Sequence, residues 1–387
     1  MSLPKIHTLA FACLFSGFCQ SAYASVADNF SFSGFGRIAA GYLDTDQAEF
    51  KGYSDAISLK PDSLLGLQAN YQFSDDLTLT AQGVLRSSDT EDSGLEWLYL
   101  TWLLDDNLTV RLGRQRGPFF LYSDSIDIGY AYPWVNLPYQ IYSGYIFPTY
   151  DGLDATWGYS TQEFDFTLQG YAGYYPGGDL NIFGGTTDYE LKAVAGVIAK
   201  VKHNNTELRL SRYRGNPKLN VTSLDYFRTL VAGSDEALDA LKTEGWGSIT
   251  QIGISYDSMS QFYRAEWMKS ESDIKYMVPV VEAYFISGGF YVDAFTYHLT
   301  YSESKTTYNT YTGDSAATLA PVFSQLTKDN LRSWTAGVRW DFRKNMALKF
   351  DVTLLDGNEN ENSFYDSPQT GFDRDATLYL IAIDWVF

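Results

Sequence analysis

The sequence predicts an all-β protein: a transmembrane antiparallel β-barrel of about sixteen strands, with short periplasmic turns, long extracellular loops and the third loop folded into the lumen. Apolar and polar residues alternate along many short segments, the period of a strand with two different faces. After the leader, no apolar run approaches the length of a transmembrane helix, and a membrane protein without one must be a closed barrel. The 30 Tyr, 25 Phe and 9 Trp suit strands and interfacial aromatic girdles.

The first element is a secretory signal peptide, expected over residues 1–24, followed by a single barrel domain over residues 25–387. A basic start precedes an apolar run, and an A-x-A cleavage site ends at Ala24. Cys13 and Cys19 both lie in this segment. The mature chain is therefore expected to have no disulfide, no thiol catalyst and no cysteine metal site.

Short polar turns alternate with long polar connections along the rest of the chain. The turns are expected around Asp75, Asp106, Gln162, Asn204, Met259, Val292 and Lys344. The long connections are expected near residues 44–60, 87–94, 116–150, 177–190, 215–247, 270–280, 303–330 and 356–375. This alternation implies about sixteen strands with both termini on the short-turn side. A barrel of that size leaves an aqueous channel.

The last strand ends the chain with an apolar face, formed by Tyr379, Ile381, Ile383, Trp385 and Phe387. An open apolar edge invites aggregation, so the strand makes sense if it faces lipid and closes a barrel. A terminal Phe after alternating hydrophobic residues resembles the C-terminal segment of Gram-negative outer-membrane proteins. The resemblance implies that the barrel-assembly machinery reads these residues.

A more specific resemblance appears at Leu112-Gly113-Arg114-Gln115-Arg116-Gly117, which ends the predicted fifth strand. A Gly-Arg-(Asn/Gln) segment ends the fifth strand of the Gram-negative general porins, before a loop that folds into the lumen. The resemblance implies a sixteen-stranded homotrimer in outer-membrane lipid, which passes small hydrophilic solutes and ions by passive diffusion. It implies no enzymatic activity and no cofactor. Residues 116–150, the expected constriction loop, depart from the family because they are aromatic and proline-rich.

Charged residues near this loop are candidates for the constriction. Arg37, Arg86 and Arg111 have lumen parity on the first, third and fifth strands, whereas Arg114 has the opposite parity unless a bulge intervenes. The resemblance implies that Arg37, Arg86 and Arg114 lie opposite Asp124 and Asp127. Opposed charge rows would orient a polar solute by a transverse field. The alternative is that these are solvated lumen charges held by neighbouring acids.

The aromatic residues of the loop leave two interpretations open. The loop is expected to fold inward, because a long apolar loop left in water would expose a packing surface. Its aromatic rings either anchor it to the wall or to a neighbouring subunit, or line the path and stack on sugar rings. The second version, a saccharide-preferring pore, would use Tyr130, Tyr132, Trp134 and Tyr139.

Other functions are less well supported. The net charge of −19 argues against nucleic-acid binding, which needs a basic surface. An outer-membrane barrel hydrolase is an alternative, with His298 as the one suitably placed base. No metal site is expected, because Glu361 replaces the glycine of a calcium loop that would begin at residue 356. Short loop helices are expected at 234–242, capped by Ser234, and at 316–329.

Overall fold

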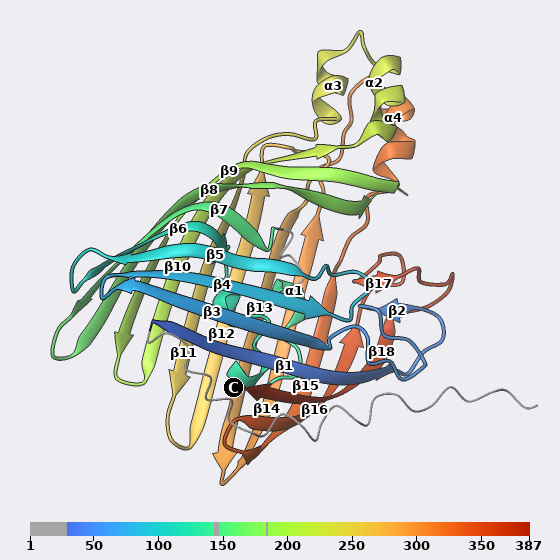
Figure 1. The fold of residues 1–387 in the computed structure, drawn as a ribbon. Helices are drawn as coiled ribbons and strands as arrows, with labels where there is room; N and C mark the ends of the chain where they lie inside the picture. Colours follow the sequence, from blue (N-terminus) through green and yellow to red (C-terminus); the bar gives the residue numbers. More distant parts are fainter. Residues whose placement is uncertain (1–28, 143–146, 183–184) are drawn as a thin grey trace, which may run out of the picture.

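The computed structural model describes residues 29–142, 147–182 and 185–387 and forms a closed antiparallel barrel (Figure 1). The expected signal peptide lies outside the described residues. Sixteen strands close the barrel, in the order β1-β18-β16-β15-β14-β13-β12-β11-β10-β9-β8-β7-β6-β5-β4-β3. The predicted fold class is confirmed, including the strand number.

The strand bounds follow the predicted alternation of turns and loops. They are β1 (Phe30–Leu43), β3 (Leu64–Ser74), β4 (Leu77–Arg86), β5 (Gly94–Leu103), β6 (Leu108–Arg116), β7 (Thr149–Ser160), β8 (Phe164–Ile182), β9 (Gly185–His203), β10 (Thr206–Asn220), β11 (Gly247–Asp257), β12 (Gln261–Ser272), β13 (Val280–Val292), β14 (Phe295–Thr307), β15 (Leu331–Arg343), β16 (Met346–Asp356) and β18 (Asp375–Val386).

The two faces of each strand differ as a membrane barrel requires. In β18, Ile381 and Ile383 are exposed on the outer face, whereas Leu380 and Asp384 are buried on the inner face. The first and last strands pair with each other, with Arg37 opposite Asp384 in the register. Each outward apolar side chain can therefore meet lipid, and no strand edge of the barrel is left unpaired.

One predicted loop is wrong. Residues 177–190 were expected to form a loop, but β8 and β9 continue through most of this segment as an extended hairpin. Two register shifts on β8, next to Gly173 and Gly178, allow the hairpin to bend. Stacking of Tyr175 on Tyr189, with ring centroids 5.5 Å apart, supports it. The segment was expected to be one of the long polar connections, but the strands continue through register shifts instead.

Extracellular loops build a helical cap on one side of the mouth. It contains α2 (Asp225–Leu230), α3 (Asp235–Ala240) and α4 (Ala316–Phe323), which stand together beyond the strand ends in Figure 1. The Ser234 side chain accepts a hydrogen bond from the Ala237 backbone and caps α3, as expected. Loops of three connections share its apolar core, through Leu224, Ile274 and Leu319. No helix in the described parts of the chain is long and apolar enough to span a membrane.

A second small sheet lies at the junction of the first and last strands. It pairs β2 (Glu49–Phe50), in the β1–β3 connection, with β17 (Tyr365–Asp366), in the β16–β18 connection. Only two residue pairs form it, so no alternation in the sequence was long enough to predict it.

The described parts of the third loop, residues 117–142 and 147–148, fold into the barrel. The loop contains short turns at Ser123–Ser125 and Gly129–Ala131 and the helix α1 (Tyr139–Tyr142), which packs on β13 and β14. Figure 1 shows α1 enclosed by the strands. The prediction that this loop enters the lumen is confirmed.

Candidate constriction site

An aromatic core fastens the third loop to the wall. The loop residues Phe120, Trp134 and Ile141 are fully buried in one cluster with Phe285 of β13 and Ile198 of β9. Trp134 Nε1 donates a hydrogen bond to Thr300 Oγ1 of β14 at 2.7 Å. The tyrosine-rich composition of the loop therefore supplies contacts to the wall, since each ring brings a large apolar area and a polar atom.

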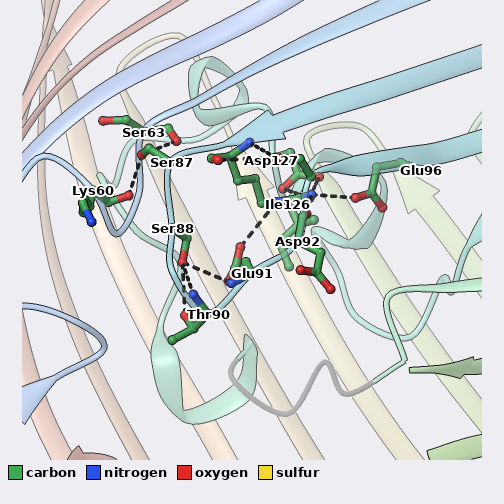
Figure 2. Close-up of polar contacts among 12 residues, drawn as sticks. Lys60, Ser63, Ser87, Ser88, Thr90, Glu91, Asp92, Glu96, Ile126 and Asp127 are labelled. Atoms are coloured by element: carbon green, nitrogen blue, oxygen red, sulfur yellow. Dashed lines mark hydrogen bonds and ion pairs between the residues drawn. The ribbon is translucent and has the colours of Figure 1, made fainter. Parts of the chain in front are cut away.

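A compact charge cluster holds the loop to β4 and β5. Arg86 Nη1 donates to Glu96 Oε1 at 2.7 Å, and Arg86 Nη2 donates to both Asp127 carboxylate oxygens at 3.0 Å. Arg116, at the end of β6, bonds the same two acids. Figure 2 shows Glu96 and Asp127 in this cluster together with Glu91, whose carboxylate lies 3.4 Å from Arg86 Nε.

The cluster also fixes the charge state of Asp127. Burial alone would raise the pKa of this carboxyl, but the attraction of Arg116 and Arg86 outweighs burial and lowers its pKa below the usual range. Two guanidiniums thus bond the carboxylates of Glu96 and Asp127, with Glu91 also paired to Arg86, and the loop is ionically tied to the wall.

The remaining arginines of the expected wall have separate partners. Arg111 bonds Asp154 of β7 at 3.1 Å on the inner face. Arg114 does not face Asp124 or Asp127: its pair is Asp151, at 2.9 Å, and both share the outward parity of the exposed Leu112. Gly113 has φ of 134°, and the alternation holds as far as Arg114, which keeps the outward parity assigned from the sequence. Arg116 shares that parity, but its side chain turns inward to Glu96 and Asp127, so the alternation ends at Gln115 and Arg116, which are both buried.

The fourth arginine, Arg37, belongs to a buried cluster on β1, β18 and β16. Arg37 Nε donates to Asp384 Oδ1 at 2.7 Å, and Lys349 Nζ lies 2.9 Å from Asp384 Oδ2. Lys349 Nζ also donates to the carbonyl oxygens of Gly129 and Trp134 in the loop. Sequence parity placed Lys349 in the lumen, but no pattern indicated that the loop would cover it.

On the opposite side, the loop is fastened to β10 and β12. The Tyr142 hydroxyl donates to Glu266 at 2.6 Å, and the Leu121 backbone donates to the same carboxylate at 2.9 Å. Arg209 donates to the carbonyl oxygens of Pro118 and Phe119. Anchors therefore lie on walls far apart around the ring, and the loop crosses the lumen between them.

The four candidate stacking aromatics have different surroundings. Tyr132 and Trp134 are buried, with 3% and 1% of their surfaces exposed. Tyr139 is half-buried against Phe50, with its hydroxyl bonded to Asn136. Tyr130 donates to the Lys344 carbonyl oxygen at 2.9 Å and lies under Arg339. Burial raises the pKa of Tyr132 to about 12, so its hydroxyl stays neutral.

Asp124 differs from every other acid of the site. Its side chain is exposed in the short turn Ser123–Ser125 and forms no hydrogen bond or ion pair with the described residues. It is therefore the loop charge left available to ions in the channel, whereas Asp127 is neutralised.

The candidate base His298 is not placed for catalysis on an outside substrate. His298 Nε2 lies 3.1 Å from Asp351 Oδ1, and the other Asp351 oxygen accepts from the Val135 backbone at 2.7 Å. The Trp134 ring covers the imidazole, with centroids 6.1 Å apart. Within the described residues, no group of acids and histidines suited to a metal ion occurs.

The geometry defines a class: a closed sixteen-stranded barrel with a polar inner face and an inserted third loop. Known structures share this fold. No family model and no curated protein matches the sequence. In-vitro folded OmpT, an outer membrane protein of Vibrio cholerae, in its trimer form, matches with a TM-score of 0.55 and 13% identity, over 92% of this chain and 99% of that chain.

Two further structures match equally well. Salmonella typhi OmpF in complex with daunomycin has a TM-score of 0.57 and 14% identity, over 93% of this chain and 98% of that chain. The outer membrane channel DcaP of Acinetobacter baumannii has a TM-score of 0.58 and 13% identity, over 92% and 97%. The chain therefore has the fold of the outer-membrane porins, as the resemblance in its sequence implied.

Proposed function

We propose that the protein is an outer-membrane porin through which small hydrophilic solutes and ions diffuse passively. The observation that carries this proposal is the polar inner wall of a sixteen-stranded barrel, narrowed by a loop anchored on both sides. A sixteen-stranded barrel is wide enough for an aqueous channel. No step in such transport needs a cofactor or a catalytic residue.

The location and assembly follow from the same proposal. Residues 1–24 export the chain, the barrel-assembly machinery reads the terminal strand, and the barrel lies in outer-membrane lipid. The trimeric form of the matched OmpT structure supports a homotrimer. Phe387 pairs with Gly34 of β1 through two backbone hydrogen bonds, which suits a terminal residue needed for closure.

General diffusion is favoured over a saccharide-preferring pore. A ring that stacks on sugars must expose a face to the path, and Tyr132 and Trp134 are buried against the wall. Tyr130 and Tyr139 are partly exposed but hydrogen-bonded in place. An enzyme is not favoured, because His298 and Asp351 lie beneath the loop.

A planar-bilayer recording of the purified protein tests this function. We expect stable unit conductance steps in salt and uptake of small neutral solutes by liposomes that contain the protein. A folded barrel that gives neither conductance nor solute uptake would contradict the proposal. Current block by oligosaccharides, abolished in Tyr139→Ala, would instead favour the saccharide version. Hydrolysis of phospholipid or peptide, lost in His298→Ala, would favour an enzyme.

A further inference from the structure

The seam of the barrel is the junction of β1 and β18, where the two ends of the chain meet. Its main-chain ladder runs from the pair Phe35–Val386 to the pair Leu43–Leu378. At the extracellular end, the β2–β17 pair bridges the two connections that flank the seam. Phe50 and Tyr365 meet there edge to face, with ring centroids 5.2 Å apart. The seam is thus reinforced from outside the barrel by its own loops.

The third loop contacts the same seam from inside. Gly129 lies directly on the Arg37–Asp384 ion pair, which crosses from β1 to β18. A Cβ at residue 129 would overlap both side chains, so only glycine fits there without displacing the pair. Lys349 of the next strand, β16, donates to the Gly129 carbonyl oxygen. The loop backbone therefore touches three adjacent strands at the point of closure.

These contacts extend along much of the seam. Towards the periplasmic end, the Tyr130 hydroxyl donates to Lys344 in the β15–β16 turn at 2.9 Å. In the middle, Val135 is fully buried in one apolar cluster with Leu378 and Leu380 of β18. Towards the extracellular end, the Tyr139 ring packs edge to face on Phe50 of β2, with centroids 5.2 Å apart.

The buried charges make this contact specific. Arg37, Lys349 and Asp384 are all at most 5% exposed, and they comprise two cations and one anion. A buried charge without compensation is costly. The loop supplies compensation through the carbonyl oxygens of Gly129 and Trp134 and through the Tyr132 ring, 4.9 Å from Lys349 Nζ. In its docked position, the loop therefore supplies acceptors for the excess positive charge that it covers.

We propose that the third loop is an internal clasp of the barrel seam, which holds β1, β18 and β16 together in addition to constricting the lumen. The third loop connects β6 to β7, across the lumen from the seam. It therefore links the seam to two strands that are not its neighbours in the sheet. This inference does not depend on solute transport, because the clasp acts in a closed barrel of any function.

Hydrogen exchange of the folded, full-length barrel in detergent tests the clasp, with peptides resolved by mass spectrometry. Gly129→Val lifts the loop tip from the Arg37–Asp384 pair. We expect exchange of the β1 and β18 amides to rise at least about tenfold, with β8 and β9 unchanged. The matched control is Tyr142→Phe, which removes an anchor of the same loop at β12 and should leave β1 and β18 unchanged.

A second variant covers the case in which Gly129→Val does not assemble. Lys349→Met keeps the Arg37–Asp384 pair and removes the cation that bonds the loop, together with its own ion pair to Asp384. It should give the same selective increase at β1 and β18, and a lower temperature for loss of the SDS-resistant form. An unchanged seam in the assembled variants, or an equal increase in all strands, overturns the clasp. A missing conductance in the wild-type barrel would contradict the proposed function alone.

Discussion

Trp134 should be the side chain on which docking of the third loop depends most. It is among the largest fully buried residues, and its ring contacts Phe285, Tyr122 and His298. Truncation of a buried Trp to Ala typically costs about 3–5 kcal/mol, because the apolar contacts are lost and a cavity remains. The population of undocked loop should then rise by roughly 10²- to 10⁴-fold, since about 1.4 kcal/mol corresponds to a factor of ten.

Two variants separate packing from hydrogen bonding at this position. Trp134→Ala removes both the ring and the 2.7 Å bond to Thr300. Trp134→Phe keeps an aromatic ring in place and loses the N–H donor, worth about 1 kcal/mol, together with the smaller part of the indole packing. The Thr300 hydroxyl still has the Ser287 hydroxyl as a hydrogen-bond partner at 2.7 Å, so it does not become a buried group without a partner.

Single-channel recording and limited proteolysis report the docked state of the loop. We expect Trp134→Ala to give larger, noisier conductance steps and cleavage within residues 117–142, and Trp134→Phe to behave almost as the wild type. A correctly assembled Trp134→Ala barrel with wild-type conductance and a protected loop would refute the reasoning. It would mean that the ionic anchors alone hold the loop.

Three further outcomes are expected. Asp124→Asn should reduce the cation-to-anion permeability ratio roughly two- to fourfold, since one charge about 8 Å from an ion is worth about 0.5 kcal/mol in water; a reversal potential unchanged in low salt would contradict this. The lowered pKa of Asp127 means that its stabilisation of the docked loop is complete above its unfolded value of about 3.9 and is lost as pH falls through the lower folded value. Proteolysis of the loop should therefore increase only in strong acid, and Asp127→Asn should expose the loop at neutral pH and abolish that acid transition. Phe387→Ser should lower the yield of heat-modifiable barrel in outer membranes, and an unchanged yield would argue against its role in assembly.

The barrel could be predicted because the pattern that specifies each strand and turn lies within a short segment of the sequence. Alternation along the strands and the polar turns predicted the strand count and the face of most strand residues, whereas the entry of the third loop was predicted from its aromatic composition and from the resemblance to porins. Strand parity placed Arg114 on the outer face, where the structure has it. The family resemblance placed Arg114 opposite Asp124 and Asp127, whereas it pairs with Asp151. The extended β8–β9 hairpin was not predicted, because register shifts next to Gly173 and Gly178 interrupt the alternation in this segment.

The arrangement of the candidate site depends on distant parts of the chain. Asp384 and Arg37 lie at opposite ends of the sequence, and Gly129 lies far from both. Their contact follows from barrel closure together with the path of the loop across the lumen, which no periodicity encodes. The same applies to Arg116, whose sequence parity is that of the outward Arg114 but whose side chain bonds Glu96 and Asp127 on the inner face.

Because the helical cap stands on one side only, the extracellular rim of the barrel is taller on that side than on the opposite side. The connections from β10 to β15 carry α2, α3 and α4, whereas the β4–β5 connection on the other side spans only residues 87–93. A small solute can approach from the side that has no helices, because the cap stands on one side of the mouth only. A bulky particle, such as a protein at the cell surface, meets the helices first on one side and reaches the rim from the other. The cap therefore limits the directions from which a large partner can reach the barrel, but it does not limit the approach of a small solute.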